Sequence, residues 1–141
     1  MTGERMTGER TLAVLDSSVG VKWIKPEPGR DQALALLAGH REGRLRIVVS
    51  ALFVHEIVAV AVKHGGADLG ERVWENLERA DLTVVGLDDT LARAALDHCR
   101  SLGCSFYDAL APAVAERLAA PLYSADQRAH ARFDGVKLIG R

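Results

Sequence analysis

Four acidic residues stand where carboxylates are able to take part in a reaction. Asp16 ends the apolar run at residues 12–15, Asp126 follows the stretch PLYSA, Asp108 begins the stretch DALAPAVA, and Glu56 interrupts the segment FVHEIVAVAV. Gathered on one edge, such carboxylates repel each other unless they are protonated or bridged by a cation. Oxygen ligands favour a hard ion, Mg²⁺ or Mn²⁺, over zinc, and the natural chemistry of such an ion is phosphodiester hydrolysis.

The elements that must position these acids alternate between strands and helices. Apolar runs predict strands at residues 12–15, 46–50, 82–87, 121–125 and 136–140. Helices are expected over residues 19–24, 30–43, 51–64, 67–80, 90–102, 105–119 and 127–133. This alternation predicts an α/β fold, a three-layer sandwich in which a mostly parallel sheet is covered by helices on both faces.

Local signals mark where several of these helices begin and end. Ser17 or Ser18, Ser50, and Asp88 or Asp89 are expected to cap the helices that follow them. Glycines end helices readily, so Gly65 with Gly66, and Gly103, are expected to end the helices before them.

The predicted topology brings three of the acids to one edge of the sheet. Ligands of such sheets bind at the carboxyl ends of the strands, where the strand order reverses. Asp16 and Asp126 each follow a strand, and Asp108 lies in the first turn of the helix that returns to the strand before Asp126. Ser124 is expected to hold either a hydrogen bond behind the acids or a metal-bound water.

Glu56 is the fourth candidate because its helical neighbours are apolar. Residues such as Phe53 and Val60 share its stripe, so its charge is expected to project from a buried face and to need a cation. An ion pair with Lys22, Lys63 or an arginine is the alternative that the sequence leaves open.

Asp108 has a feature of its own. Pro112, four residues later, has no N–H group, so the Asp108 carbonyl is expected to lack its usual helical partner. Small residues around Asp108 leave room for a ligand.

Each acid also has a purely structural interpretation. Asp16 and Asp126 suit helix N-caps, and the helix dipole favours an acid such as Asp108 in a first turn. For each acid taken alone, the structural interpretation stays open. If all three acids had only structural roles, however, their position on one edge of the sheet would be a coincidence. For Asp88 and Asp89 the cap interpretation is preferred.

Composition limits the classes of protein that remain. The formal net charge of −1 and the pI near 6.5 show no basic excess of the kind that nucleic-acid binders usually carry. Cys99 and Cys104 are expected to be packing residues in a reduced, cytoplasmic protein, and no segment is apolar enough for a membrane span. Residues 1–10 repeat MTGER and are expected to form a disordered tail before one domain over residues 11–141.

Together the segments LDSSVGVKWI, HEIV, FYDALAPAVAERLAAPLYSADQR and VKLIG resemble a PIN domain, in particular the VapC-type ribonuclease toxins of toxin–antitoxin pairs. The resemblance implies a five-stranded parallel sheet, Mg²⁺ or Mn²⁺, RNA as substrate, a homodimer, and inhibition by a cognate VapB-like antitoxin. It implies that Asp16, Glu56, Asp108 and Asp126 are the four acids that hold the metal and perform catalysis, with Ser124 as the hydroxyl residue behind them. Ala59 departs from the pattern, since many relatives carry asparagine there.

Other functions with similar strand ends fit the sequence less well. A haloacid-dehalogenase-like phosphatase needs an acid two residues after Asp16, where this chain has Ser18, and a receiver domain needs paired acids where this chain has DSS. The remaining alternative to a nuclease is a catalytically weak PIN-like module that binds RNA or protein.

Overall fold

The computed structural model describes residues 10–140, so nearly all of the expected tail lies outside the described residues. Five strands form one sheet in the order β3-β2-β1-β4-β5, and all neighbouring strands are parallel. Their bounds are β1 (Thr11–Leu15), β2 (Leu45–Ser50), β3 (Thr83–Val85), β4 (Leu122–Ser124) and β5 (Val136–Leu138). The predicted parallel sheet is confirmed, with strands slightly shorter than expected at the second half of the chain.

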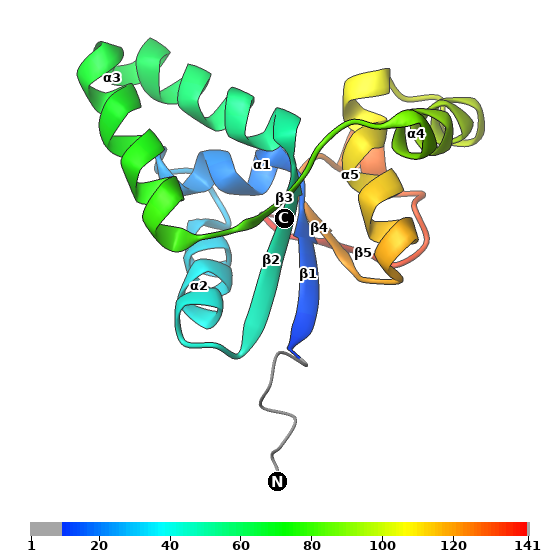
Figure 1. The fold of residues 1–141 in the computed structure, drawn as a ribbon, viewed down its shortest axis with the longest axis horizontal. Helices are drawn as coiled ribbons and strands as arrows, with labels where there is room; N and C mark the ends of the chain where they lie inside the picture. Colours follow the sequence, from blue (N-terminus) through cyan, green and yellow to red (C-terminus); the bar gives the residue numbers. More distant parts are fainter. Residues whose placement is uncertain (1–9, 141) are drawn as a thin grey trace, which may run out of the picture.

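Helices cover the sheet on both faces, which confirms the three-layer sandwich. The helices are α1 (Ser17–Gly20), the 3₁₀ helix η1 (Val21–Trp23), α2 (Arg30–Arg41), α3 (Ala51–Ala80), α4 (Asp89–Leu102), α5 (Phe106–Leu118) and α6 (Gln127–His130). Figure 1 shows α1, α2 and α3 on one side of the sheet and α4 and α5 on the other.

Alternate residues of the central strands pack into two separate hydrophobic cores, one on each face of the sheet. Successive side chains of a strand point to opposite faces. Val14 and Val48 therefore pack with α4 and α5, while Leu15 and Ile47 pack with α1, α2 and α3. All four are almost fully buried. Burial on both faces explains why these strands are apolar at every position in their centres.

The long helix α3 is two helices joined at a pair of glycines. Gly65 (φ −142°, ψ 16°) and Gly66 (φ 81°, ψ −178°) leave the helical conformation inside Ala51–Ala80. The positive φ at Gly66 suits glycine, which has no Cβ to clash there. Figure 1 shows the sharp change of direction, and the predicted break at this position is confirmed.

Close packing at Gly20 sets the distance between α1 and α3. A Cβ atom on Gly20 would lie 2.5 Å from Cζ of Phe53 and 2.8 Å from Cδ1 of Ile57. Both side chains are buried on α3. Only glycine lets the helix after β1 approach α3 this closely, so Gly20 holds the end of β1 against the helix that carries Glu56.

Two of the expected caps differ in detail from the sequence prediction. The N-cap of α1 is Asp16 itself, and its carboxylate accepts from the N–H of Ser18, so the prediction of a serine cap was wrong. Ser50 occupies the N-cap position of α3, but its hydroxyl makes no capping hydrogen bond. Gly103 ends α4 with φ 69°, as predicted.

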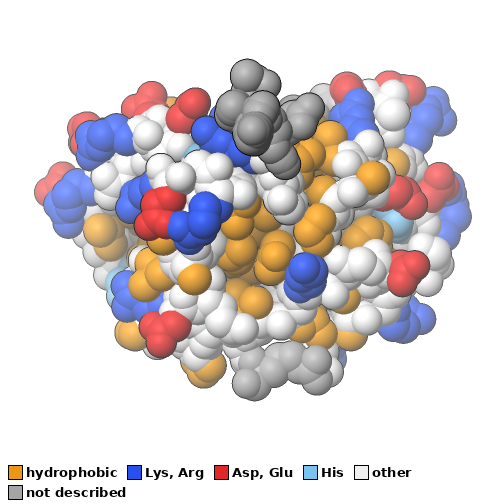
Figure 2. Space-filling model, turned by 90° about the horizontal axis from the view of Figure 1, so that it is seen from below, with side chains coloured by type: hydrophobic (Ala, Val, Ile, Leu, Met, Phe, Trp, Pro, Cys, Tyr) orange, Lys and Arg blue, Asp and Glu red, His pale blue; other side chains and the backbone are white. Residues whose placement is uncertain are grey.

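The surface carries mixed charge. Figure 2 shows the molecule from below the view of Figure 1, with hydrophobic side chains gathered near the centre and side chains of both charges around them. No helix among residues 10–140 is both long enough and apolar enough to cross a membrane.

Candidate functional site

Asp16 and Asp126 lie at the point where the strand order reverses. Asp16 directly follows β1, Asp126 lies two residues after the end of β4, and these two strands pair in parallel at the centre of the sheet. From β1 the chain leads to β2 on one side, whereas β4 and β5 lie on the other. Both acids therefore lie at the carboxyl edge of the sheet, as predicted. Parallel sheets bind their ligands at this edge.

Both of these acids also cap a helix. Oδ2 of Asp16 accepts from the N–H of Ser18 at 3.0 Å, and Oδ1 of Asp126 accepts from the N–H of Ala129 at 3.1 Å. The cap interpretation is thus correct for both residues, but it does not exclude a second role. Each cap occupies one carboxylate oxygen and holds the other in a fixed direction.

Asp108 lies in the first turn of α5, where Ser105 is the N-cap and its hydroxyl accepts from the N–H of Asp108 at 3.1 Å. Pro112 lies inside this helix, so the Asp108 carbonyl has no helical donor, as predicted. His130 takes that place: its Nε2 lies 2.7 Å from the carbonyl oxygen of Asp108.

Ser124 is completely buried and lies within a group of hydrogen bonds behind the acids. Its hydroxyl lies 2.7 Å from Nδ1 of His130 and accepts from the N–H of Asp126 at 3.0 Å. It is also 3.5 Å from the hydroxyl of Ser18, which accepts from the N–H of Ala125 at 2.9 Å. Of the two expected roles of Ser124, this geometry favours the hydrogen bond behind the acids, because its side chain is fully shielded from solvent.

Glu56 does not lie on a buried face, and that part of the sequence prediction was wrong. The residue is exposed, whereas Phe53, Ile57 and Ala61 form the buried stripe of α3. The first half of α3 is apolar on most of its surface, so an apolar neighbourhood in the sequence did not indicate which side faces the core. The assignment of Glu56 as the second acid therefore depends on the family resemblance.

None of the four acids forms an ion pair with another residue in the range 10–140. Lys22, one of the alternative partners considered for Glu56 beside Lys63 and the arginines, contacts Glu27 instead, at 3.3 Å. Within the described residues, no arginine or lysine provides these carboxylates with the partner of a structural ion pair.

The donor set fits a magnesium-type ion that keeps much of its water. In the described part of the chain, no three His, Cys, Asp or Glu side chains are grouped closely enough to hold a metal ion by themselves. Mg²⁺ is usually bound through one or two carboxylates, water and substrate phosphates rather than in a complete protein cage. Asp16, Asp108 and Asp126 are half-buried and have no basic partner in the described part of the chain, which suits that mode of binding.

The pKa values of two groups, the carboxyl of Asp88 and the thiol of Cys104, are shifted from their ordinary values. The N–H of Leu91 and then the side chain of Arg117 lower the pKa of Asp88, the N-cap of α4, which confirms the cap interpretation of this residue. Burial, followed by the nearby Cys99 and Asp108, raises the pKa of the Cys104 thiol. Both cysteines pack against the α4–α5 core, as expected.

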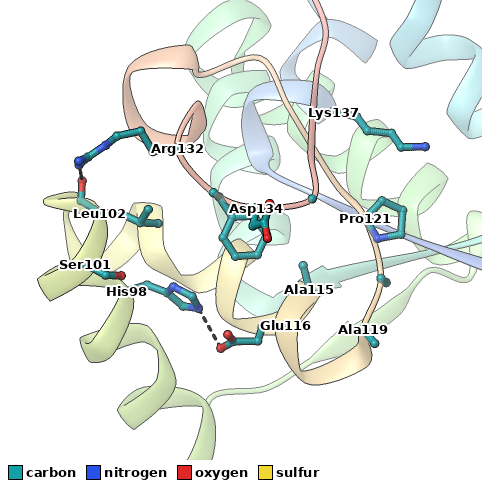
Figure 3. A pocket seen from close by; sticks show the side chains of 13 residues that line it. His98, Ser101, Leu102, Ala115, Glu116, Ala119, Pro121, Arg132, Asp134 and Lys137 are labelled. Atoms are coloured by element: carbon teal, nitrogen blue, oxygen red, sulfur yellow. Dashed lines mark hydrogen bonds and ion pairs between the residues drawn. The ribbon is translucent and has the colours of Figure 1, made fainter.

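A large open pocket of about 890 Å³ lies away from these acids (Figure 3). Its lining includes Pro121 and Gly135, which directly precede β4 and β5, so it opens at the amino ends of these strands. His98 and Glu116 form a 3.1 Å pair within it. None of the four candidate acids lines this pocket.

His130 is the residue of this region that the sequence analysis missed. Two signals pointed to it: Pro112 indicated a carbonyl in need of a donor, and His130 follows Asp126 by one helical turn. Neither signal identifies the contact alone, because Asp108 and His130 are 22 residues apart.

The family model that describes the PIN domain matches residues 13–136 of this chain. The chain belongs to the PIN domain family. The match covers most of β1, all of β4 and the segments that contain Asp16, Glu56, Asp108 and Asp126. Among curated proteins, no sequence matches this one significantly.

Solved structures of toxin–antitoxin proteins share the PIN fold of this chain. A toxin–antitoxin complex from Klebsiella pneumoniae has a TM-score of 0.68 and 14% identity, covering 89% of this chain and 95% of that chain. DNA-bound VapBC from Salmonella typhimurium has a TM-score of 0.67 and 16% identity, covering 91% and 96%. VapC20 from Mycobacterium tuberculosis, described as a toxin that cleaves the sarcin–ricin loop, has a TM-score of 0.66 and 16% identity, covering 89% and 98%. Identities this low show a shared fold.

Proposed function

We propose that this PIN domain protein is a Mg²⁺- or Mn²⁺-dependent endoribonuclease that acts as the toxin of a type II toxin–antitoxin pair. The observation that carries the proposal is the pairing of β1 with β4, which places Asp16 and Asp126 at adjacent strand ends where the strand order reverses. Hydrogen bonds through Ser124 and His130 tie Asp108 to the same edge. Family membership and the fold shared with VapC toxins support it.

In this proposal Asp16, Asp108 and Asp126 hold the metal, and Glu56 completes the acidic set from α3. A divalent ion bound there would orient the scissile phosphate and lower the pKa of the attacking water. The caps at Asp16 and Asp126 hold each carboxylate in one orientation before RNA arrives, since one oxygen of each is engaged by a backbone N–H. Preorganised groups of this kind need no rearrangement when the substrate binds.

The proposed partner is a VapB-like antitoxin, because several structures with this fold are VapBC complexes. Carboxylates that have no basic partner among residues 10–140 can bind an arginine or lysine from an inhibitor. We propose that the antitoxin inserts such a side chain among the acids, and that the toxin forms a homodimer in the complex.

Cleavage of total RNA by purified protein, with Mg²⁺ or Mn²⁺ and with EDTA, tests the activity. Asp16→Asn and Asp108→Asn should each lower the cleavage rate by about 10²–10³-fold or more, the scale expected when stabilisation of transition-state charge is lost. Asp89→Asn is the matched control, because Asp89 is a first-turn acid of α4, exposed and paired with Arg93. Expression of the wild type, but not of Asp108→Asn, should arrest bacterial growth.

The outcomes separate the nuclease from the alternative module. Equal cleavage by the wild type and both variants would indicate a contaminating nuclease and refute the proposal. Binding of RNA without metal-dependent cleavage would favour the catalytically weak PIN-like module. One observation favours this alternative: among residues 10–140, no three acidic, histidine or cysteine side chains are grouped closely enough to hold a metal ion.

A further inference from the structure

His130 is a buried histidine with no role in the reaction as described so far. It is the last residue of α6 and is fully shielded from solvent, with 0% of its surface exposed. Both ring nitrogens have partners at 2.7 Å: Nε2 contacts the carbonyl oxygen of Asp108, and Nδ1 contacts the hydroxyl of Ser124. A buried ring with two short hydrogen bonds is held in one position and one orientation.

The chemistry of the two partners assigns a role to each ring nitrogen. A carbonyl oxygen can only accept a hydrogen bond, so Nε2 of His130 carries the hydrogen that is donated to Asp108. In the neutral ring, Nδ1 is then the acceptor for the hydroxyl of Ser124. The imidazole thus receives one hydrogen bond from β4 and donates one to α5.

The Asp108 carbonyl needs an outside donor because of Pro112. In a regular α-helix this oxygen would accept from the N–H four residues later, which a proline lacks. An unpaired backbone carbonyl in this position would cost free energy and would leave the first turn of α5 free to shift. Nε2 of His130 supplies the missing donor from a different element.

Hydrogen bonds continue from Ser124 to the other two acids. The Ser124 hydroxyl accepts from the N–H of Asp126 at 3.0 Å and lies 3.5 Å from the hydroxyl of Ser18. The N–H of Ser18 donates to the carboxylate of Asp16 at 3.0 Å. The imidazole therefore links the segment that carries Asp108 to the segments that carry Asp16 and Asp126.

We infer that His130 is a positioning residue: by holding the Asp108 carbonyl, it fixes the first turn of α5, and with it the Asp108 carboxylate, relative to Asp16 and Asp126. The inference rests on the proposed function and adds a residue on which metal binding depends without contact to the metal. Residues behind the ligands typically change metal affinity or activity by about 10–100-fold when replaced.

Two conservative variants separate the two hydrogen bonds of the ring. In His130→Gln, the side-chain amide nitrogen reaches the position of Nε2 and keeps a donor for the Asp108 carbonyl. In His130→Asn, the amide oxygen takes the place of Nδ1, which keeps an acceptor for Ser124 but leaves Asp108 without a donor. Both variants bury an amide of similar polarity, so they share the general cost of changing this site.

Mn²⁺ affinity, measured by calorimetry on the full chain, is the primary readout, with RNA cleavage and melting in EDTA alongside. His130→Asn should bind Mn²⁺ about 10–100-fold more weakly than the wild type, whereas His130→Gln should stay close to it. His98→Asn is the control for loss of a buried histidine, because His98 pairs with Glu116 in the pocket of Figure 3, away from the acids. It should leave Mn²⁺ affinity unchanged.

Pro112→Ala gives a second, independent test. An alanine at this position restores an N–H for the Asp108 carbonyl, so the loss caused by His130→Asn should be smaller in the Pro112→Ala background. Such non-additivity is the signature of two residues that act on one atom. A role of His130 in stability alone would predict independent, additive effects on Mn²⁺ affinity.

The outcomes distinguish this inference from the function on which it rests. If the wild type neither binds Mn²⁺ nor cleaves RNA, the proposed function is wrong, and the inference fails with it. If the wild type does both, but the Asn and Gln variants bind Mn²⁺ equally well, or affinity simply follows the melting temperature, then His130 only packs the core and the inference alone is overturned.

Discussion

Asp126 caps a helix and is also one of the carboxylates that we propose to hold the metal. Asp126 caps α6 through Oδ1, and α6 ends at His130, whose N–H donates to the Asp126 carbonyl. The residue proposed to hold the metal therefore also holds the helix that carries the positioning histidine. Removing its charge and removing its cap are different changes, and different substitutions achieve them.

Asp126→Asn and Asp126→Ala should differ in stability but agree in metal binding. Asparagine caps a helix about as well as aspartate, so Asp126→Asn should unfold in EDTA at nearly the wild-type temperature. Alanine removes the acceptor for the N–H of Ala129, which should lower the free energy of unfolding by about 1 kcal/mol. Both variants should lose most Mn²⁺ affinity. Thermal melts and calorimetry check this, and retained Mn²⁺ affinity in Asp126→Asn would reduce Asp126 to a cap.

At the residue scale, local signals predicted some features of the site and not others. Asp16, Asp108 and Asp126 could be placed from the sequence because a strand end or a helix start is a local feature, and topology then sets the edge. The exposure of Glu56 could not, since α3 is apolar on more than one side. The contact between His130 and Asp108 depends on tertiary packing, so the sequence showed only that the Asp108 carbonyl needed a donor.

At the scale of elements, the position of α1 against α3 depends on the absence of a side chain at Gly20. The contact at Gly20 is too close for a Cβ atom unless Phe53 or Ile57 moves. Because Asp16 caps α1, any displacement of α1 also moves the carboxylate that the cap orients.

Gly20→Ala should destabilise the protein by about 1–3 kcal/mol, the usual cost of overpacking a core. Gly86→Ala is the control, since a Cβ atom there would meet no atom within 4 Å. Thermal melts in EDTA give the comparison. Equal melting temperatures for the two variants would show that α3 adapts easily and that Gly20 does not set this distance.

The order and kind of the elements followed from the sequence more fully than their ends did. Glycine pairs and buried apolar runs are strong signals, and the break at Gly65 and Gly66 and the stop at Gly103 both occur as predicted. The predicted strand ends and caps were less accurate. Hydrogen bonds to neighbouring strands decide where a strand ends, and competition among nearby polar side chains decides which residue caps a helix. Asp16, rather than a serine, took the cap of α1 for that reason.

At the scale of the molecule, metal binding should be visible as stability. A ligand that binds only the folded state at about 100 times its dissociation constant adds roughly 2.7 kcal/mol, which is a shift of several degrees in the melting temperature of a domain of this size. Mn²⁺ should therefore raise the melting temperature of the wild type relative to EDTA. The Asp16→Asn variant should show little of this shift, and an equal shift in both proteins would place the ion elsewhere.

The parallel pairing of β1 with β4 also determines when during synthesis the site can first exist. β1, β2 and β3 are neighbours in the sheet and can associate while the chain is still growing, but β4 joins β1 from more than a hundred residues further along the chain. Until then one side of β1 is unpaired, and neither Asp126 nor His130 is present at the carboxyl edge of the sheet, where Asp16 lies. The proposed metal site therefore cannot form on a nascent chain until β4 has been synthesised and has paired with β1.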